Sequence, residues 1–251
     1  MRETPRWQSL YIICFKNCVK ICRKVVNRID NVAVFLYNKP ISFGTVGNGD
    51  CANFLAVWFL QMELLEKTIL EKGKVLPGGV LKVGSFLNNL MDARLLKEIG
   101  KEIYSHFKGC GVTKILTIEA SGIGIACVAA QFFDCPVLFA KKSKTSNLDG
   151  EFFTAECFSY THQKTNVLFV PKDFLTKDDK VLIIDDFLAH GEATKAVANI
   201  IEQAGATLKG IAIAVEKGFQ GAGDEWRKKG VDILSLAIVD SMEDGKIEFR
   251  K

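Results

Sequence analysis

The stretch VLIIDDFLAHGEAT, residues 181–194, places two adjacent aspartates after an apolar run and follows them with a short loop that contains one glycine. The apolar run, residues 181–184, has three β-branched side chains and is typical of a central strand in a parallel sheet. From residue 192 to residue 204 the apolar positions recur at helical spacing, and Gly205 follows as a stop signal. The stretch therefore predicts a strand that ends at an acidic pair, then a short loop and a helix.

The residues of this unit suit a sugar phosphate. Ligands of open α/β sheets bind beyond the carboxyl ends of the strands, where this loop would lie. A loop that opens a helix offers backbone N–H groups and the positive end of the helix dipole to a phosphate. Asp185 and Asp186 suit sugar hydroxyls or the water around a divalent cation. Spacing alone leaves the alternative of a capped helix with two solvated acids open, because both are common in α/β proteins.

Strand-like and helix-like segments alternate along most of the remaining chain. Helices are predicted over residues 62–71, from the cap residue Asp92 to Gly109, and over 123–133, 192–204 and 224–229. The helix after Asp92 is expected to turn one apolar face to the core, and this face consists of Leu95, Leu96, Ile99, Ile103 and Phe107. Strands are predicted over residues 80–83, 114–118, 137–141, 152–160, 167–170, 181–184, 210–215 and 233–239. Such alternation is typical of a parallel sheet with helices on both faces. The polar stretch 141–151 predicts a loop that can close.

The sequence resembles the type I phosphoribosyltransferases. An apolar strand followed by an acidic pair and a small-residue loop is the motif that binds phosphoribosyl diphosphate (PRPP) in that family. Over residues 62–251 the chain is similar to the bacterial xanthine phosphoribosyltransferases, through segments that follow one another in the same order. These segments are MELLEKTILEKGKVL, LKVGSFLNN, TIEASGIG, FAKKSKT and IAVEKGFQ.

The resemblance implies a fold and an activity. The fold is the α/β type I phosphoribosyltransferase fold, a central, mainly parallel sheet flanked by helices, with a small hood subdomain from about residues 62–91 and the C-terminal segment. The activity is transfer of the 5-phosphoribosyl group from PRPP to xanthine, which gives xanthosine 5'-monophosphate and pyrophosphate in purine salvage. Mg²⁺ is the implied cofactor, held by PRPP and water with no direct protein ligand.

The resemblance also assigns residues to each part of the substrates. The catalytic pair would be Asp185 and Asp186, which would face ribose hydroxyls or magnesium-bound water. The 5-phosphate of PRPP would bind to the loop of Ala189, His190, Gly191, Glu192 and Ala193. The purine would bind to Leu81, Asn88 and Lys217. The pyrophosphate would bind to Ala120, Ser121, Gly122, Lys141 and Lys144.

Two of these positions carry arguments of their own. Many relatives have asparagine in the phosphate loop where this chain has His190, a change that is tolerable where backbone amides do most of the binding. Lys217 follows the strand-like segment IAIAV, residues 211–215. Its ammonium can satisfy the carbonyl oxygens of an oxopurine, whereas the amino group of adenine would face it as a second donor.

Charge and cysteine content divide the chain near residue 61. Residues 1–61 carry 8 Lys/Arg and 3 Asp/Glu, against 25 and 26 in residues 62–251. The larger part therefore has no excess of positive charge that would indicate binding to nucleic acids. Four of the 8 cysteines lie in the first part. The other four have no CxxC spacing and are predicted to be reduced, mostly buried thiols of a cytoplasmic protein.

The first 61 residues have no counterpart in the resemblance. Lys16 and Lys20 interrupt the apolar stretch, which argues against a signal peptide, and no uninterrupted apolar run reaches the roughly 20 residues of a membrane span. We expect a poorly ordered upstream leader, read in frame before Met62. A basic segment could instead belong to a PRPP-sensing purine transcription regulator, although no pair of helices joined by a short turn is visible.

The sequence therefore predicts a cytoplasmic, homodimeric enzyme whose partners are xanthine and PRPP, with neither a membrane nor a nucleic acid among them. A guanine or hypoxanthine phosphoribosyltransferase is the alternative within the same family, and the DNA-binding regulator is the alternative outside enzymes.

Overall fold

The computed structural model describes residues 63–143, 150–159 and 164–250. The predictions made for residues 1–61 and for Lys144 lie outside this described part. A helix over residues 63–72 opens it, close to the predicted 62–71.

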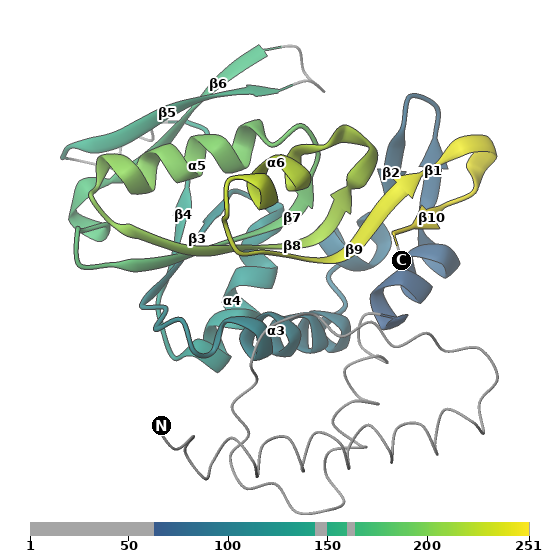
Figure 1. Ribbon diagram of the computed structural model, residues 1–251, viewed down its shortest axis with the longest axis horizontal. Coiled ribbons are helices and arrows are strands. Elements are labelled where there is room, and N and C mark those ends of the chain that lie inside the picture. The colour runs from purple at the N-terminus through teal and green to yellow at the C-terminus, as the bar shows by residue number, and fades with distance from the viewer. Residues whose placement is uncertain (1–62, 144–149, 160–163, 251) are drawn as a thin grey trace, which may run out of the picture. The chain divides into compact units, whose positions relative to one another are not determined.

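A six-stranded sheet forms the centre of the described part, in the order β10-β9-β8-β7-β3-β4 (Figure 1). The strands are β3 Lys114–Ile118, β4 Val137–Ala140, β7 Lys180–Leu188, β8 Thr207–Lys217, β9 Ile233–Ser241 and β10 Glu248–Phe249. All neighbours pair in parallel except β10, which is antiparallel to β9. The prediction of a mainly parallel sheet is confirmed.

Helices cover both faces of this sheet (Figure 1). One face carries α3, Ala93–Phe107, and α4, Ser121–Phe133, and the other carries α5, Glu192–Gln203, and α6, Ala222–Lys228. The side chains of β7 alternate between the two layers. Leu182 and Ile184 belong to the core with α3 and α4, whereas Val181 and Ile183 belong to the core with α5. A strand covered on both faces must be apolar throughout, which explains the run in the sequence.

The predicted cap of α3 is present. The Asp92 carboxylate accepts hydrogen bonds from the backbone N–H groups of Arg94 and Leu95, at 3.0 and 3.3 Å. These bonds satisfy two of the N–H groups that have no partner inside the helix. The predicted core face of the helix is buried, and it consists of Leu95, Leu96, Ile99, Ile103 and Phe107.

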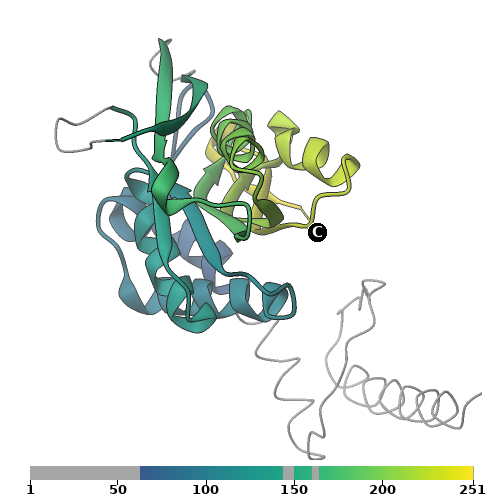
Figure 2. The ribbon, with the colours of Figure 1, turned by 90° about the vertical axis from the view of Figure 1, so that its left-hand side faces the viewer.

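Two hairpins and several short helical turns surround the sheet. The hairpin of β1, Lys74–Leu76, and β2, Val80–Lys82, lies in the region predicted as a hood and is followed by the π-helical turn η1, Gly84–Asn88. The hairpin of β5, Phe152–Ser159, and β6, Lys164–Pro171, packs beside α5 and extends beyond it (Figure 2). The 3₁₀ turns are η2 Lys172–Phe174, η3 Gly218–Gln220 and η4 Glu243–Gly245.

β7 is longer than predicted. It continues to Leu188, because Phe187 and Leu188 still pair with Val215 and Glu216 of β8. The prediction that the strand ends at the acidic pair is therefore wrong, and both aspartates lie inside the strand. Pairing with a long neighbour overrides the low strand preference of aspartate.

The four cysteines of the described part are free thiols, as expected of reduced cysteines. Three of them, Cys110, Cys135 and Cys157, are partly buried and pack against the two cores, whereas the prediction of a buried thiol is wrong for Cys127, which is exposed. Cys127 lies on the outer side of α4, whose inner side buries Ala126 and Ala129. None of the helices in the described ranges is long and apolar enough to cross a membrane.

Glu102 of α3 is a buried acid. The residue is 2% exposed, and neither carboxylate oxygen has a hydrogen-bond partner among the described residues. Burial raises the pKa of the Glu102 carboxyl to about 7. The folded protein therefore holds this proton to a higher pH than the unfolded chain does, so stability falls as pH rises from about 4.5 to about 7.

We expect Glu102→Gln to remove this pH dependence, because glutamine stays neutral at every pH in the range. At pH 8 the variant should be more stable than the wild type by about 1–3 kcal/mol, and at pH 4.5 the two should be alike. Urea unfolding across the pH range measures both values. Glu98→Gln, on the same helix but partly exposed, is the control and should keep the wild-type slope. An unchanged slope in Glu102→Gln would contradict the assignment.

Candidate functional site

The predicted site residues gather at one edge of the sheet. β3, β7 and β8 are parallel neighbours, so their carboxyl ends lie side by side. Each of these ends leads into a turn and a helix, namely α4, α5 and α6. Residues 120–122, residues 189–193 and Lys217 lie at these three ends, whereas the other predicted purine residues, Leu81 and Asn88, belong to β2 and η1.

The acidic pair of β7 is tied to the elements around it. Asp186 is 7% exposed, and the side-chain amide of Asn88, at the end of η1, donates to Asp186 Oδ2 at 3.1 Å. The backbone N–H of Asp186 donates to Asp185 Oδ1 at 2.9 Å. Asn88, predicted as a purine contact, therefore lies against the acidic pair.

The environment of the pair disfavours negative charge. Burial raises the pKa of the Asp185 carboxyl well above its ordinary value, and the charge of Asp186 raises it further. The Asp186 N–H and the nearby Lys142 act in the opposite direction. A ligand that brings hydroxyl donors or positive charge to this point would stabilise the ionised carboxylates.

The turn between β3 and α4 packs directly on Asp185. A side chain at Gly122 would overlap Thr117 and would lie 3.1 Å from Asp185 Oδ1, so only glycine fits. Ala120 is the cap residue of α4 and makes no side-chain cap bond. The Glu119–Ala120 peptide bond is cis, which no sequence signal indicated. The three backbone positions predicted for pyrophosphate are the cap residue Ala120 and the first two residues of α4, Ser121 and Gly122.

Glu119 connects this turn to the polar loop. Its Oε1 accepts a hydrogen bond from the backbone N–H of Lys142. Lys141 pairs with Phe169 of β6 through two backbone hydrogen bonds of 3.0 and 2.9 Å, so its backbone is fixed where the loop begins. Glu119 was not among the predicted site residues, although an acid directly after a buried strand is a signal of the same kind as the pair in β7.

The phosphate loop leads into an uncapped helix start. Gly191 is the cap residue of α5, with φ of +82°, a conformation that glycine adopts without strain. The first helical bond runs from the Lys195 N–H to the Gly191 carbonyl at 2.8 Å. Gly191 has no side chain with which to cap the helix, which leaves the N–H groups of the first turn to an anion. His190, the departure from the family pattern, is exposed beside this turn.

Lys217 reaches from the end of β8 to the β1–β2 hairpin. Its Nζ donates to the Gly79 carbonyl at 3.0 Å, and burial lowers the pKa of the Lys217 ammonium. Leu81 belongs to the same hairpin and is 6% exposed. Phe219 is 47% exposed and lies close to Gly79. Lys217 thus contacts the hairpin that carries Leu81 through Gly79, a contact that the sequence did not indicate.

Comparison with known proteins shows the family of this chain. The family model described as the phosphoribosyl transferase domain matches residues 83–240. The xanthine phosphoribosyltransferase of Ruminiclostridium cellulolyticum is 54% identical over 188 residues, which are 75% of this chain and 99% of that protein. The chain belongs to the phosphoribosyl transferase family. The xanthine phosphoribosyltransferase of Bifidobacterium adolescentis is 53% identical over 192 residues, 75% of this chain and 100% of that protein. The predicted resemblance is confirmed.

Solved structures of family members share the fold. The adenine phosphoribosyltransferase of Thermoanaerobacter pseudethanolicus superimposes with a TM-score of 0.58 at 21% identity, over 70% of this chain and 98% of that one. The adenine phosphoribosyltransferase of Saccharomyces cerevisiae gives a TM-score of 0.59 at 16% identity, over 71% and 99%. At such identities the comparison shows the type I phosphoribosyltransferase fold alone.

A role of the acidic pair in binding PRPP can be tested by mutation. In the variant Asp185→Asn with Asp186→Asn, we expect the melting temperature to stay equal or to rise, because two mutually repelling carboxylates become neutral amides of the same shape. Binding of magnesium PRPP should weaken roughly a hundredfold, as for the loss of one or two charge-assisted hydrogen bonds. Calorimetric titration measures the affinity, and thermal unfolding measures the stability. A stable variant that binds PRPP as tightly as the wild type would refute a role for the pair.

Proposed function

We propose that this protein transfers the 5-phosphoribosyl group of PRPP to xanthine, giving xanthosine 5'-monophosphate and pyrophosphate in purine salvage. Relatives named xanthine phosphoribosyltransferase, more than half identical over almost their whole length, support this choice of base. The observation in the structure that carries it is Lys217, a half-buried cation at the end of β8 whose ammonium reaches the hairpin that carries Leu81.

An ammonium at this position selects among purines by charge and by hydrogen bonding. Xanthine has two carbonyl oxygens and is acidic enough to be partly anionic near neutral pH, so it offers acceptors to the Lys217 Nζ. Adenine presents an amino group, which would leave two donors facing each other in a poorly solvated pocket. The base therefore has to be an oxopurine.

PRPP fits the described residues at two points. The uncapped start of α5 offers backbone N–H groups and the positive end of the helix dipole to the 5-phosphate. Asp185 and Asp186 are consecutive residues of β7 and suit the ribose hydroxyls. The poor solvation of Asp185 makes such donors favourable, because they replace the water that burial removes.

Mg²⁺ is part of the proposal, as an ion brought by PRPP and surrounded by water. Among the residues that the structure describes, no group of three or more His, Cys, Asp or Glu could hold a metal ion. Asp185 and Asp186 suit the water shell of a hard cation. When bound, the ion would neutralise the charge that develops on the departing pyrophosphate.

In such a transfer the protein orients the reactants and keeps water away. Cleavage of the bond to pyrophosphate gives the ribose oxocarbenium character, and the purine nitrogen attacks from the other side, so no protein nucleophile is needed. The acidic pair would hold the ribose, residues 120–122 the pyrophosphate, and Lys217 the base. Lys141, whose backbone is fixed on β6, would add positive charge beside the leaving group.

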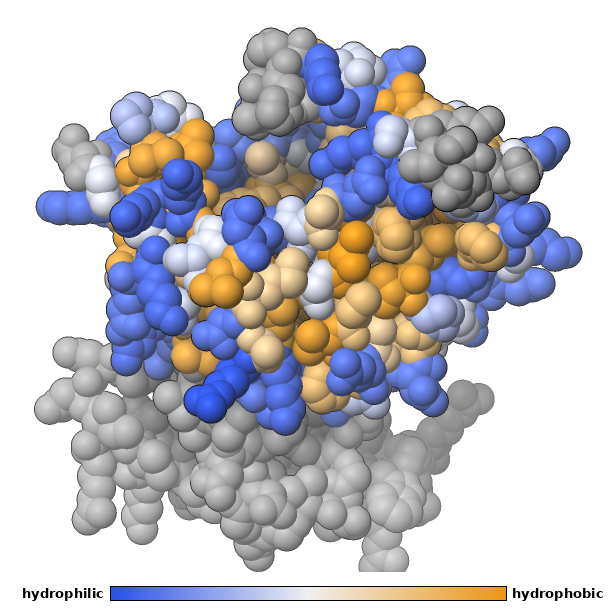
Figure 3. All heavy atoms as spheres, turned by 180° about the vertical axis from the view of Figure 1, so that it is seen from behind, coloured by the Kyte–Doolittle hydropathy of each residue, from blue (hydrophilic) through white to orange (hydrophobic). Residues whose placement is uncertain are grey.

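A homodimer in the cytoplasm completes the proposal. The edge strand β4 and the β6 region enclose a groove of about 570 Å³ lined mainly by apolar residues, among them Val137, Leu138, Phe139 and Phe174. Seen from behind, the described residues show a broad band of apolar side chains (Figure 3). Such a surface supports contact between two copies of the chain. A monomeric mass in sedimentation equilibrium would remove the dimer from the proposal.

The assay that tests the proposal combines a panel of bases with one variant. With PRPP and Mg²⁺, the wild type should show its highest kcat/KM for xanthine among xanthine, guanine, hypoxanthine and adenine. Lys217→Met keeps the length of the side chain and removes its charge and donors. It should lower kcat/KM for xanthine by roughly 2–3 kcal/mol, on the order of a hundredfold, while PRPP affinity hardly changes.

Lys217→Arg is the matched control, because it keeps the charge, and it should lose less than the methionine variant. If kcat/KM were highest for guanine or hypoxanthine, that base and not xanthine would be the substrate. If Lys217→Met lowered kcat/KM for xanthine and the affinity for PRPP by the same factor, Lys217 would not be a specific purine contact. If the wild type turned over none of the bases, the proposal of an enzyme would be wrong.

A further inference from the structure

Residues 217–221 connect β8 to α6 and begin with Lys217; we call them the base loop. Their backbone rests directly on an ion pair. A side chain at Gly218 would overlap Asp240 Oδ1 and would lie 2.8 Å from Arg250 Nη2. Glycine at this position therefore lets the loop approach the two charged groups more closely than any other residue would allow.

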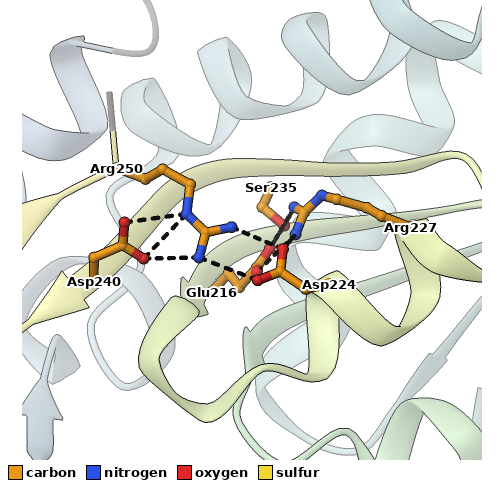
Figure 4. Close-up of polar contacts among 6 residues, drawn as sticks. All are labelled: Glu216, Asp224, Arg227, Ser235, Asp240 and Arg250. Carbon is orange, nitrogen blue, oxygen red and sulfur yellow. Dashed lines mark hydrogen bonds and ion pairs between the residues drawn. The ribbon is translucent and has the colours of Figure 1, made fainter.

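The ion pair under the loop is built around Arg250 (Figure 4). Its Nε donates to both carboxylate oxygens of Asp240 at 3.1 Å, and its Nη2 donates to Asp240 Oδ1 at 2.8 Å. Its Nη1 donates to Asp224 Oδ1 at 2.9 Å. Asp240 belongs to β9 and Asp224 to the first turn of α6, so one guanidinium links the sheet to the helix that follows the base loop.

A second cluster fixes the other side of the loop. Glu216, directly before Lys217, is 1% exposed and accepts two hydrogen bonds from the Arg227 guanidinium, at 2.9 and 2.7 Å (Figure 4). The Ser235 hydroxyl donates to the same carboxylate. Arg227 also donates to Asp224 at 3.0 Å, which joins the two clusters. Both ends of the base loop are thus held by charged hydrogen bonds.

The opposite side of the loop faces the hairpin. Lys217 donates to the Gly79 carbonyl, and the Phe219 ring lies next to Gly79. The loop is therefore enclosed between the hairpin and the Arg250 cluster. A shift of its backbone on the Arg250 side would move the Lys217 ammonium relative to the hairpin.

We propose that Arg250 is a positioning residue for purine recognition. Its ion pairs with Asp240 and Asp224 fix the backbone position of Gly218, and this in turn places the Lys217 ammonium where it can contact the base. This inference rests on the proposed function, since it takes Lys217 as the residue that contacts the purine. Arg250 does not touch the acidic pair or the start of α5 in the contacts described, so its influence should reach the base and not PRPP.

Arg250 is also the member of the network that can be changed without a large loss of stability. Its carboxylate partners keep about two-fifths of their side-chain surface in solvent, at 40% for Asp240 and 42% for Asp224. Water can therefore solvate them when the guanidinium is removed. Loss of Arg227 would instead leave the buried Glu216 carboxylate with only Ser235 beside it, and such a variant could fail to fold.

The test compares Arg250→Met with Arg250→Lys and with a remote control, Lys101→Met. The control removes a partly exposed ion pair with Glu98 on α3, where no site residue lies. We expect Arg250→Met to raise KM for the purine about tenfold, with KM for PRPP unchanged. Arg250→Lys should recover part of the loss, because lysine keeps the charge but cannot bridge both carboxylates with a planar fork. Lys101→Met should match the wild type in both constants.

Hydrogen exchange supplies a readout that does not depend on turnover. The backbone amides of residues 217–221 should exchange faster in Arg250→Met than in the wild type, and at the wild-type rate in Lys101→Met. Unchanged exchange and an unchanged purine KM would overturn the proposal, as would an equal rise of both KM values, which would indicate a general structural role. If the wild type converts no purine, the proposed function fails, and the exchange rates alone then decide whether Arg250 seats the base loop.

Discussion

β7 is covered on both faces, by α3 and α4 on one side and by α5 on the other, so a polar side chain is tolerated only where the strand leaves the helical layers. Asp185 and Asp186 occupy that point. The adjacent strands β3 and β8 run parallel to β7 and end at the same edge, and the turn after β3 packs against Asp185 while η1 contacts Asp186. The site is thus a consequence of how the central strand is buried.

The two substrates would be bound by different kinds of structure. On this proposal the phosphate end would depend on backbone geometry, namely the start of α5 and the glycine at its cap, and would need few particular side chains. Such a loop would tolerate His190 where many relatives have asparagine. The base and ribose ends would depend on side chains that meet from distant parts of the sequence, such as Lys217 with the Gly79 carbonyl and Asn88 with Asp186.

This difference also decides what could be predicted from the sequence. The cap and apolar face of α3, the bounds of β3 and the start of α5 follow local rules of spacing and capping, and the structure has them as predicted. The length of β7 depends on pairing with β8, and the contact between Asn88 and Asp186 joins residues 98 positions apart. The helical or strand spacing of apolar residues in one segment contains no information on such contacts. Glu119 was missed for a different reason, because a single acid after a strand is a weak signal until its partner, the Lys142 N–H, is known.

For the same reason, specificity for the base is harder to predict from a sequence than the class of reaction. The acidic pair and the loop after it lie within one stretch of residues, so a sequence pattern can show both. The position of Lys217 depends on Glu216 beneath it, on Gly218 beside it and on charges contributed by α6, β9 and Arg250. A homologous chain could keep Lys217 and lose one of these supports, and its ammonium would then lie elsewhere although the motif is unchanged. Base preference in this family should therefore follow the whole network that holds the base loop, and the identity of the lysine alone is insufficient to predict it.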